Sequence, residues 1–507
     1  MKASILLINP PTRLAVSLPG TSESELATSA CRQAFGTLPP LGLLYISSEL
    51  IDAGFSVEVV DFNTRPYDYD SLRAMLTGKD IVGISVFSPN REEVERIARD
   101  IKRTDGKIPV IAGGPDITLY RRLPDYADVA VIGEAEGRIV DVVDSVLNRR
   151  GLDGRQGVLF RQNGKVVGNA ECQVPEDLDR ISFPARSILK ERYRLWGKDL
   201  EGKVTTIVTS RGCPFRCRFC PRSALSCSYR ARSVANVVDE VREIYRSGYR
   251  VLAIIDDTFT VNRARMMEIM DKIIEDRLRL LIAIEGRVVP ADEELYAKMR
   301  RAGVRLLYFG VESGNQDVLD YYRKGVTVEQ NRHAIELAHR LGIYTVGSFI
   351  LGAPMETSAH FERTIKFAYG TPLDVADFFV LEYPYGSEIW EEAASEGKVK
   401  EGEYNVPAGK ERGLSPFRTR EIERWCLRAF YLFYLRPKWI VRTAQKLWKE
   451  EDGRIVKLLF HLARVAIAES VRFGLRKTFD WLSRIRTPRQ VRKERERQVD
   501  EAKLGSL

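Results

Sequence analysis

The sequence predicts an α/β protein with two successive strand–helix series and a final all-helical region. Short apolar segments alternate with amphipathic ones over residues 1–150, and a second such series spans residues 204–382. Repeated units of this kind form parallel sheets covered by helices. From residue 419 onward the pattern becomes helical, basic and rich in aromatic side chains. With about 150 residues per domain as a guide, we predict domains over 1–150, 196–400 and 401–507, joined by a hairpin and linker over 151–195.

The first series has the pattern of a doubly wound parallel sheet. Its predicted strands are residues 4–9, 57–62, 80–87, 109–112 and 127–133, and its predicted helices are residues 39–53, 91–103 and 138–149. In such sheets a ligand lies beyond the carboxyl ends of the strands, where the strand order reverses. The loops at that edge are rich in Gly, Pro, Ser and Asn, which let a bulky ligand approach the backbone. These loops are residues 9–11, 85–90, 113–116 and 133–137.

A hairpin and a second series follow. Residues 157–168 are predicted as a hairpin because Asn163-Gly164 is a strong signal for a type I′ turn. The later strands are predicted at 204–209, 251–255, 280–284, 305–311, 344–351 and 376–382. The helices between them are predicted at 234–246, 264–276, 293–301, 330–341 and 358–368. This spacing predicts a central partial (β/α)6 barrel, whose active site belongs at the carboxyl ends of the strands.

Composition and charge exclude several classes of protein. A hydrophobic fraction of 44% with 29% charged residues is ordinary for globular proteins and excludes a disordered or fibrous chain. No apolar run is long enough to span a membrane, and the first residues lack the pattern of a signal peptide, so we expect a cytoplasmic protein. The net charge is +9, but residues 411–507 carry 24 Lys and Arg against 12 Asp and Glu. This basic tail suits nucleic acid, an anionic membrane surface or an acidic protein, or is simply a solvated helical surface.

Four of the seven cysteines lie within fifteen positions: Cys213, Cys217, Cys220 and Cys227. Such clustering in a large chain indicates metal or redox chemistry and not disulfides. The first three have the spacing C-x3-C-x2-C on a loop after a predicted strand, and three thiolates can bind three irons of a cubane and leave the fourth iron open. A zinc site would need four ligands in paired spacings, for which Cys227 is the available fourth. The isolated Cys31, Cys172 and Cys426 are predicted to be buried small hydrophobic residues.

The segment 210–221, SRGCPFRCRFCP, resembles the signature of the radical S-adenosylmethionine (radical SAM) superfamily, with Phe219 before the last cysteine. The resemblance implies that the open iron of a 4Fe–4S cluster binds S-adenosylmethionine. One electron then cleaves the sulfonium and yields a 5′-deoxyadenosyl radical. Residues 310–314 resemble the fourth-strand motif, which implies that Glu312 and Ser313 face the ribose and amino-acid part of the cosubstrate. Residues 347–354 resemble the fifth-strand motif, which implies that Gly352 supports the adenine, and residues 383–387 resemble the sixth-strand Pro-Gly turn.

The element after the second barrel strand resembles the version found in cobalamin-dependent members, because Asp256-Asp257 stands in place of Gly-Gly-Glu. We expect Asp257 to hold the ammonium group of the cosubstrate, although an acid at the start of a helix explains it as well. Arg287, after the third strand, is expected to pair with the carboxylate of the cosubstrate, with a solvated loop residue as the alternative.

The first domain resembles the cobalamin-binding domain of the same subgroup, and no G-x-G-x-x-G follows its first strand. The resemblance implies cobalamin-binding residues in the loops at the sheet edge: Pro10, Pro11, Ser85, Gly113, Gly114, Pro115, Gly133 and Glu134. The four histidines all lie at or beyond residue 333, so the sheet supplies no lower axial histidine. We therefore expect cobalamin with a displaced tail and a lower face covered by water or a group other than His.

Together these features predict a cobalamin-dependent radical SAM C-methyltransferase acting on an unactivated sp3 carbon. The alternative is a ring-forming enzyme that acts on a lipid or tetrapyrrole without methyl transfer. An RNA-modifying enzyme ranks last, because no RNA-binding module or second cysteine triad occurs, so no nucleic-acid partner is expected. The expected electron donor is a ferredoxin or flavodoxin.

Residues 454–486 have apolar runs between Arg and Lys, which suit a membrane surface or a helical lid over the barrel. The acceptor stays open between a lipid, a protein or peptide side chain and a small molecule.

Overall fold

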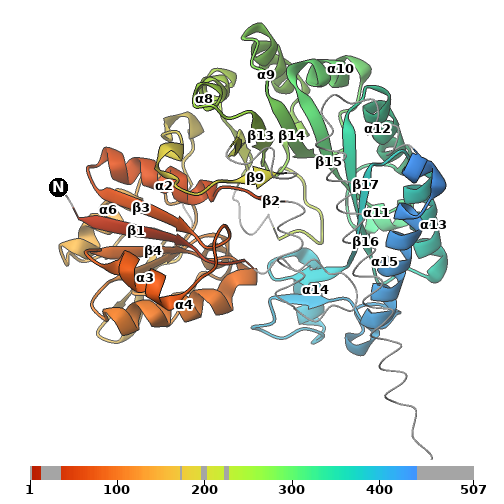
Figure 1. Ribbon diagram of the computed structural model, residues 1–507. Coiled ribbons are helices and arrows are strands. Elements are labelled where there is room, and N and C mark those ends of the chain that lie inside the picture. The colour runs from red at the N-terminus through yellow and green to blue at the C-terminus, as the bar shows by residue number, and fades with distance from the viewer. Residues whose placement is uncertain (1–2, 13–35, 172–173, 196–202, 222–227, 442–507) are drawn as a thin grey trace, which may run out of the picture.

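The computed structural model describes residues 3–12, 36–171, 174–195, 203–221 and 228–441. It has an N-terminal α/β unit, a central unit built on a curved parallel sheet, and a helix that runs along the outer edge of that sheet (Figure 1). The predicted α/β class, with its two parallel sheets, is confirmed. Within the described residues, no helix is both long and apolar enough to cross a membrane.

The first sheet has the strand order β3-β1-β4-β5-β6-β7-β8 within the described residues. Its strands are β1 (Ser4–Asn9), β3 (Ser56–Asp61), β4 (Ile81–Ser85), β5 (Val110–Gly113), β6 (Val129–Val131), β7 (Val158–Gln162) and β8 (Lys165–Asn169). The first five are parallel, and β1 lies between β3 and β4. The strand order therefore reverses beside β1, which places the expected ligand site beyond Asn9.

The predicted hairpin is part of this sheet and not of the connecting segment. Strand β7 pairs antiparallel with β6, and Val158 and Phe160 are buried in the same apolar cluster as β1. The turn between β7 and β8 has positive φ at both central residues, 51° at Asn163 and 76° at Gly164, as a type I′ turn requires.

Helices cover both faces of the first sheet. They are α2 (Leu41–Asp52), α3 (Tyr69–Leu76), α4 (Arg91–Thr104), α5 (Pro115–Tyr120) and α6 (Ile139–Leu147). Alternate residues of β1 face opposite sides: Ile5 and Leu7 pack in the core under α2 and α6, while Leu6 and Ile8 pack in the core under α3 and α4. Helices α3 and α5 were not predicted, because eight and six residues are too few to show a clear apolar period.

The second sheet has six parallel strands in sequential order within the described residues. They are β10 (Val204–Ile207), β13 (Val251–Ile254), β14 (Leu281–Gly286), β15 (Val304–Glu312), β16 (Tyr344–Leu351) and β17 (Val375–Val380). The helices between them are α8 (Val234–Arg246), α9 (Arg263–Glu275), α10 (Glu293–Ala302), α11 (Gln316–Tyr321), α12 (Val328–Arg340) and α13 (Ser358–Gly370). The outer helices form a curved wall, and the open side of the sheet faces the N-terminal unit (Figure 1). The arrangement is the predicted partial barrel.

Helix α15 (Thr419–Tyr434) packs on β17 and α13 and so covers the last strand of the barrel. Buried Arg436, just after it, donates hydrogen bonds to the carbonyls of Thr371 at 3.0 Å and Leu373 at 2.9 Å. The predicted basic segment 454–486 lies outside the described residues. In the part of the chain that the structure describes, the remaining elements are short: β2 (Gly36–Thr37), β9 (Arg194–Leu195), β11 (Ser210–Arg211), β12 (Arg230–Ala231), β18 (Glu382–Pro384), β19 (Asn405–Pro407), α14 (Glu388–Ser395) and single 3-10 turns at Ser88–Asn90, Leu178–Arg180, Arg186–Ile188, Phe259–Val261 and Lys410–Arg412.

Candidate active site

A cavity of about 840 Å³ lies between the first sheet and the open side of the barrel. The loops after β1, β4, β5 and β6 line one side, and residues after β10 and β13 line the other. Several residues predicted for cofactor binding are brought together here: Ser85, Gly113, Gly114, Pro115, Gly133, Glu134 and Asp257. Pro10 and Pro11 are not among the lining residues, whereas their neighbours Asn9 and Thr12 are.

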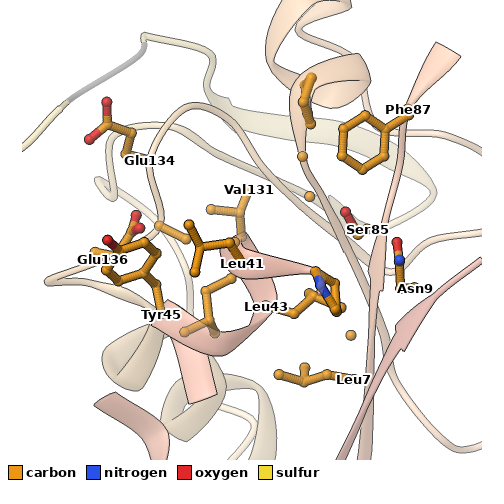
Figure 2. Close-up of a pocket in the computed structure, with 18 of the residues that line it drawn as sticks. Leu7, Asn9, Leu41, Leu43, Tyr45, Ser85, Phe87, Val131, Glu134 and Glu136 are labelled. Atoms are coloured by element: carbon orange, nitrogen blue, oxygen red, sulfur yellow. The ribbon is translucent and has the colours of Figure 1, made fainter. Parts of the chain in front are cut away.

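The deep part of the cavity is apolar and extends between the first sheet and helix α2. Figure 2 shows Leu7, Leu43 and Val131 in the lower and central part, Asn9 and Ser85 on one side, and Glu134 on the other. These deep positions were missed by sequence reasoning because alternating apolar residues of a buried strand have the same pattern as ordinary core. The one local signal is Gly83 inside a strand, where a Cβ would lie 2.5 Å from Leu7 Cδ2.

Large apolar side chains lie partly exposed around the cavity. Leu38, Phe87 and Ile255 are 38%, 39% and 37% exposed, and all three line it. They come from both units, since Ile255 follows barrel strand β13. Exposed apolar side chains that gather around one cavity indicate a ligand surface.

A buried carboxylate fixes the polar side chains at one edge of the cavity. Asp61, which is fully buried, accepts hydrogen bonds from Asn9 Nδ2 at 2.9 Å, from Asn63 Nδ2 at 2.9 Å and from the Tyr193 hydroxyl at 3.1 Å. Burial raises the pKa of Asp61 above its ordinary value. The cluster fixes the two asparagines that line the cavity.

The cysteine loop follows β10 and starts from the two-stranded ribbon of β11 and β12. Cys213, Cys217 and Cys220 are all partly exposed, and the Cys220 N–H donates to the Cys217 carbonyl at 3.0 Å. The Phe219 ring packs edge-on against Tyr322, with ring centroids 5.1 Å apart. This contact anchors the loop on the barrel.

The cysteine side chains are not arranged around one ion. No three His, Cys, Asp or Glu side chains in the described part of the chain come close enough to hold a single metal ion. Thiolates on one zinc ion lie about 4 Å apart, because each Zn–S bond is about 2.3 Å, whereas a cubane places each thiolate on a different iron. Within the described residues the three cysteines therefore form no single-ion site, and the assignment of a cluster depends on their C-x3-C-x2-C spacing. Cys227, the alternative fourth ligand, lies outside the described residues, as do Cys31 and Cys172, while Cys426 is buried as expected.

The two consecutive aspartates after β13 have different environments. Asp256 is 1% exposed and accepts hydrogen bonds at 2.6 Å from the Thr209 N–H, the Thr209 hydroxyl and the Ser210 hydroxyl. Burial raises its pKa. Asp256 therefore fixes the backbone that leads into the cysteine loop, while Asp257 is partly exposed and lines the cavity.

Arg287 and Glu312 lie at the barrel side of the cysteine loop. Arg287 is 7% exposed, so it is not a solvated loop residue, and its Nη1 atom lies 3.8 Å from Cys217 Sγ. Glu312 is buried and accepts a hydrogen bond from Lys324 Nζ at 2.6 Å. Its φ of 64° is unusual for a residue with a side chain, and such strained residues concentrate at functional sites.

Ser313 and Gly352 have structural surroundings that the sequence did not indicate. Ser313 is fully buried, and its hydroxyl contacts the Thr364 hydroxyl at 3.2 Å. Gly352 has a φ of 114°, and a Cβ there would lie 2.9 Å from Ile422 of α15. Both residues hold turns at the ends of barrel strands.

Ion pairs join the cavity to the cysteine loop. Arg211, two residues before Cys213, pairs with Glu134 and with Glu136 at 2.7 Å each. Arg230, opposite Arg211 in the ribbon, also pairs with Glu134. The carboxylate of Glu134, which was expected to bind cofactor, is therefore engaged by two arginines, and sequence reasoning missed both of them because their partners are distant in the chain.

Comparisons with known proteins agree with this arrangement. The family model of the radical SAM superfamily matches residues 207–368, and that of the B12 binding domain matches residues 28–143. An uncharacterized methyltransferase of Pyrococcus horikoshii is 29% identical over 468 residues, which are 89% of this chain and 96% of that protein. The anaerobic magnesium-protoporphyrin IX monomethyl ester cyclase of Rubrivivax gelatinosus is 31% identical over 382 residues, which are 72% of this chain and 68% of that protein.

The same fold occurs among solved structures. The radical S-adenosylmethionine methyltransferase TsrM from Kitasatospora setae, solved with cobalamin and a 4Fe–4S cluster bound, superposes with a TM-score of 0.66. The superposition covers 92% of this chain and 100% of that chain, at 19% sequence identity. At this identity the likeness concerns the fold.

Proposed function

The chain belongs to the cobalamin-dependent radical SAM methyltransferases, and on that premise we propose that it methylates an unactivated sp3 carbon of a lipid or of a protein or peptide side chain. The observation that carries the proposal is the cavity of about 840 Å³, which the cobalamin-type sheet and the start of the barrel line together. A hydrogen-abstracting centre and a methyl donor have to reach the same carbon in turn, and one shared cavity allows this. The P. horikoshii relative, a methyltransferase matched over most of both chains, supports methyl transfer.

The residues present suit the family's cofactors. The glycines at the sheet edge leave room for a large ring, the apolar depth suits a displaced cofactor tail, and Leu38, Phe87 and Ile255 offer apolar contacts around the cavity. When bound, the cluster supplies the electron that cleaves S-adenosylmethionine, and cobalamin supplies the methyl group.

We assign roles to this chain's own residues as follows. Cys213, Cys217 and Cys220 would bind three irons, and Asp257, which lines the cavity, would accept hydrogen bonds from the cosubstrate ammonium group. The Phe219–Tyr322 contact would keep water from the inner side of the loop. The basic, apolar segment 454–486 supports a lipid or a chain segment as the acceptor.

The product of the reaction tests this function. The protein would be purified without oxygen, loaded with iron, sulfide and cobalamin, and incubated with S-adenosylmethionine carrying a deuterated methyl group, a reductant, and either a lipid extract or a protein extract. We expect an acceptor that gains one deuterated methyl group, together with 5′-deoxyadenosine and S-adenosylhomocysteine.

The R. gelatinosus relative favours a second candidate, a ring-forming reaction on a tetrapyrrole. That reaction would give a product without the label.

The cluster ligands have a matched test. Cys217→Ala should abolish the formation of 5′-deoxyadenosine and leave cobalamin uptake nearly intact, because Cys217 is not among the residues that line the cavity. Cys426→Ala makes the same chemical change at a buried cysteine of α15 and should retain the cluster. A Cys217→Ala protein that still forms 5′-deoxyadenosine would reject the ligand assignment.

A further inference from the structure

Arg287 places a buried positive charge beside the cysteine loop. Its side chain is 7% exposed. Within the described residues its guanidinium donates hydrogen bonds to the Cys217 sulfur, with Nη1 and Sγ 3.8 Å apart, and to the Lys324 carbonyl. Neither acceptor is a carboxylate. A guanidinium stays charged at every working pH, so Arg287 brings an uncompensated cation to this position.

The neighbouring cation is compensated. Lys324 Nζ pairs with the Glu312 carboxylate at 2.6 Å, and both side chains are buried. Burying a charge without an anionic partner is strongly unfavourable. Of the groups that the Arg287 guanidinium contacts within the described residues, the Cys217 sulfur is the one that can carry a balancing negative charge, as a thiolate or through a negatively charged group that this thiolate binds.

The guanidinium is also held in place. Its carbon lies 3.8 Å from the centroid of the Phe215 ring, on the cysteine loop itself. The Arg287 backbone N–H donates to Thr260 Oγ1 at 2.9 Å. The backbone hydrogen bond orients the start of the Arg287 side chain, and the ring contact keeps its guanidinium beside the cysteine loop.

We propose that Arg287 is a positioning residue that donates a hydrogen bond to the Cys217 thiolate and thereby makes the iron–sulfur cluster easier to reduce. This inference rests on the proposed function, in which Cys217 binds an iron. Reduction adds negative charge to the cluster, and a nearby cation and hydrogen bonds to the sulfur ligands stabilise that added charge. The role differs from the one suggested by the sequence, which is to bind the carboxylate of the cosubstrate.

The test is a redox titration of the loaded protein in the absence of S-adenosylmethionine, followed by electron paramagnetic resonance. Arg287→Met keeps the volume and removes the charge, so we expect the midpoint potential to become more negative at unchanged iron content. Arg287→Lys keeps a charge but loses the paired N–H donors of the guanidinium, so a smaller shift of the midpoint potential in the same direction is expected. Arg263→Met is the matched control, because Arg263 is paired with Asp292 and Glu294 on the surface and should leave the potential unchanged.

Equal midpoint potentials for the wild-type, Arg287→Met and Arg287→Lys proteins would overturn the proposal. Weaker binding of S-adenosylmethionine with an unchanged potential would also overturn it, in favour of the carboxylate role. Should Arg287→Met fail to retain a cluster, the potential of Arg287→Lys decides. Failure of the proposed function is a separate result: a wild-type protein that assembles no 4Fe–4S cluster, or a Cys217→Ala protein with full cluster content, rejects the cysteine assignment whatever Arg287 does.

Discussion

Gly114, at the carboxyl edge of the first sheet, has a backbone conformation that requires glycine, and it lines the cavity. Its φ of 106° and ψ of −177° lie in a region that is open almost only to glycine. A Cβ would lie 2.9 Å from the Val86 carbonyl oxygen. We predict that Gly114→Ala lowers the free energy of unfolding by about 1–3 kcal/mol and weakens cobalamin uptake, because the loop, which lines the cavity, has to shift away from Val86. Urea unfolding and the absorbance of bound cobalamin measure the two effects.

Gly42 provides the control for this prediction. It lines the same cavity from the first turn of α2, and a Cβ there meets nothing within 4 Å. Alanine is favoured over glycine in a helix by about 0.5–1 kcal/mol, so Gly42→Ala should be at least as stable as the wild type. If Gly114→Ala unfolds at the wild-type urea concentration and binds cobalamin normally, the backbone at Gly114 is not constrained as described.

At the scale of an element, the turn from β16 into α13 depends on one buried carboxyl group. Glu356 is fully buried, and its Oε2 atom accepts hydrogen bonds from the N–H groups of Gly352 at 2.6 Å and Ala353 at 2.8 Å. Its other carboxyl oxygen has no hydrogen-bond partner among the described residues. Burial raises the pKa of Glu356 from 4.5 to about 7. The folded protein therefore keeps this proton over a range in which the unfolded chain releases it.

This difference in proton binding predicts a pH dependence of stability. Since the unfolded state binds fewer protons between pH 4.5 and about pH 7, the contribution of Glu356 to stability decreases as the pH rises through that range. Glu356→Gln keeps an acceptor for both N–H groups without a titrating proton. The difference between the free energies of unfolding of the two proteins should therefore change by up to about 3 kcal/mol in favour of the variant from acidic to mildly alkaline pH. Parallel pH profiles for the two proteins would contradict the role given to Glu356.

At the scale of the whole molecule, the two units are joined by a cluster of ion pairs. Arg211 and Arg230 come from the ribbon below the cysteine loop, while Glu134 and Glu136 come from the loop after β6. The side chains of Arg211, Glu134 and Glu136 are 16%, 19% and 7% exposed. Removing one partner of such a cluster leaves a poorly solvated charge behind. The same loop after β6 lines the cavity, so the cluster connects the two expected cofactor sites.

Arg211→Gln should thus lower the free energy of unfolding by about 2–3 kcal/mol, a value between those for exposed and for buried pairs. We also expect it to weaken the retention of cobalamin and of the cluster together, as gel filtration followed by iron and cobalamin assays would show. Arg155→Gln is the matched control, because Arg155 pairs with Asp141 on the surface of the first unit alone and should cost less than about 1 kcal/mol. Equal effects of the two substitutions would show that the cluster does not couple the units.

The sequence by itself determined the order of the longer elements, the α/β class with its two parallel sheets, and the position of the cysteine loop. These features depend on local periods and on residue types at short spacing, such as Asn163-Gly164 in the hairpin or the C-x3-C-x2-C triad. Strand β1 and helix α8 occupy the predicted residues, because an alternating strand and an amphipathic helix each have a period that the neighbouring residues already express. Short elements such as α5 lack enough residues for a period.

Only the tertiary structure decided which distant side chains meet. Glu134 and Arg211 are 77 positions apart, and Arg287 and Cys217 are 70 apart. The hairpin was correctly expected as a hairpin, but its place in the first sheet depends on which apolar faces Val158 and Phe160 pack against. Such contacts depend on how two sheets are oriented relative to each other, and no local pattern of residues encodes that orientation. The residue types of the loops were therefore visible in the sequence, while the partners that hold the loops together became visible only in the folded chain.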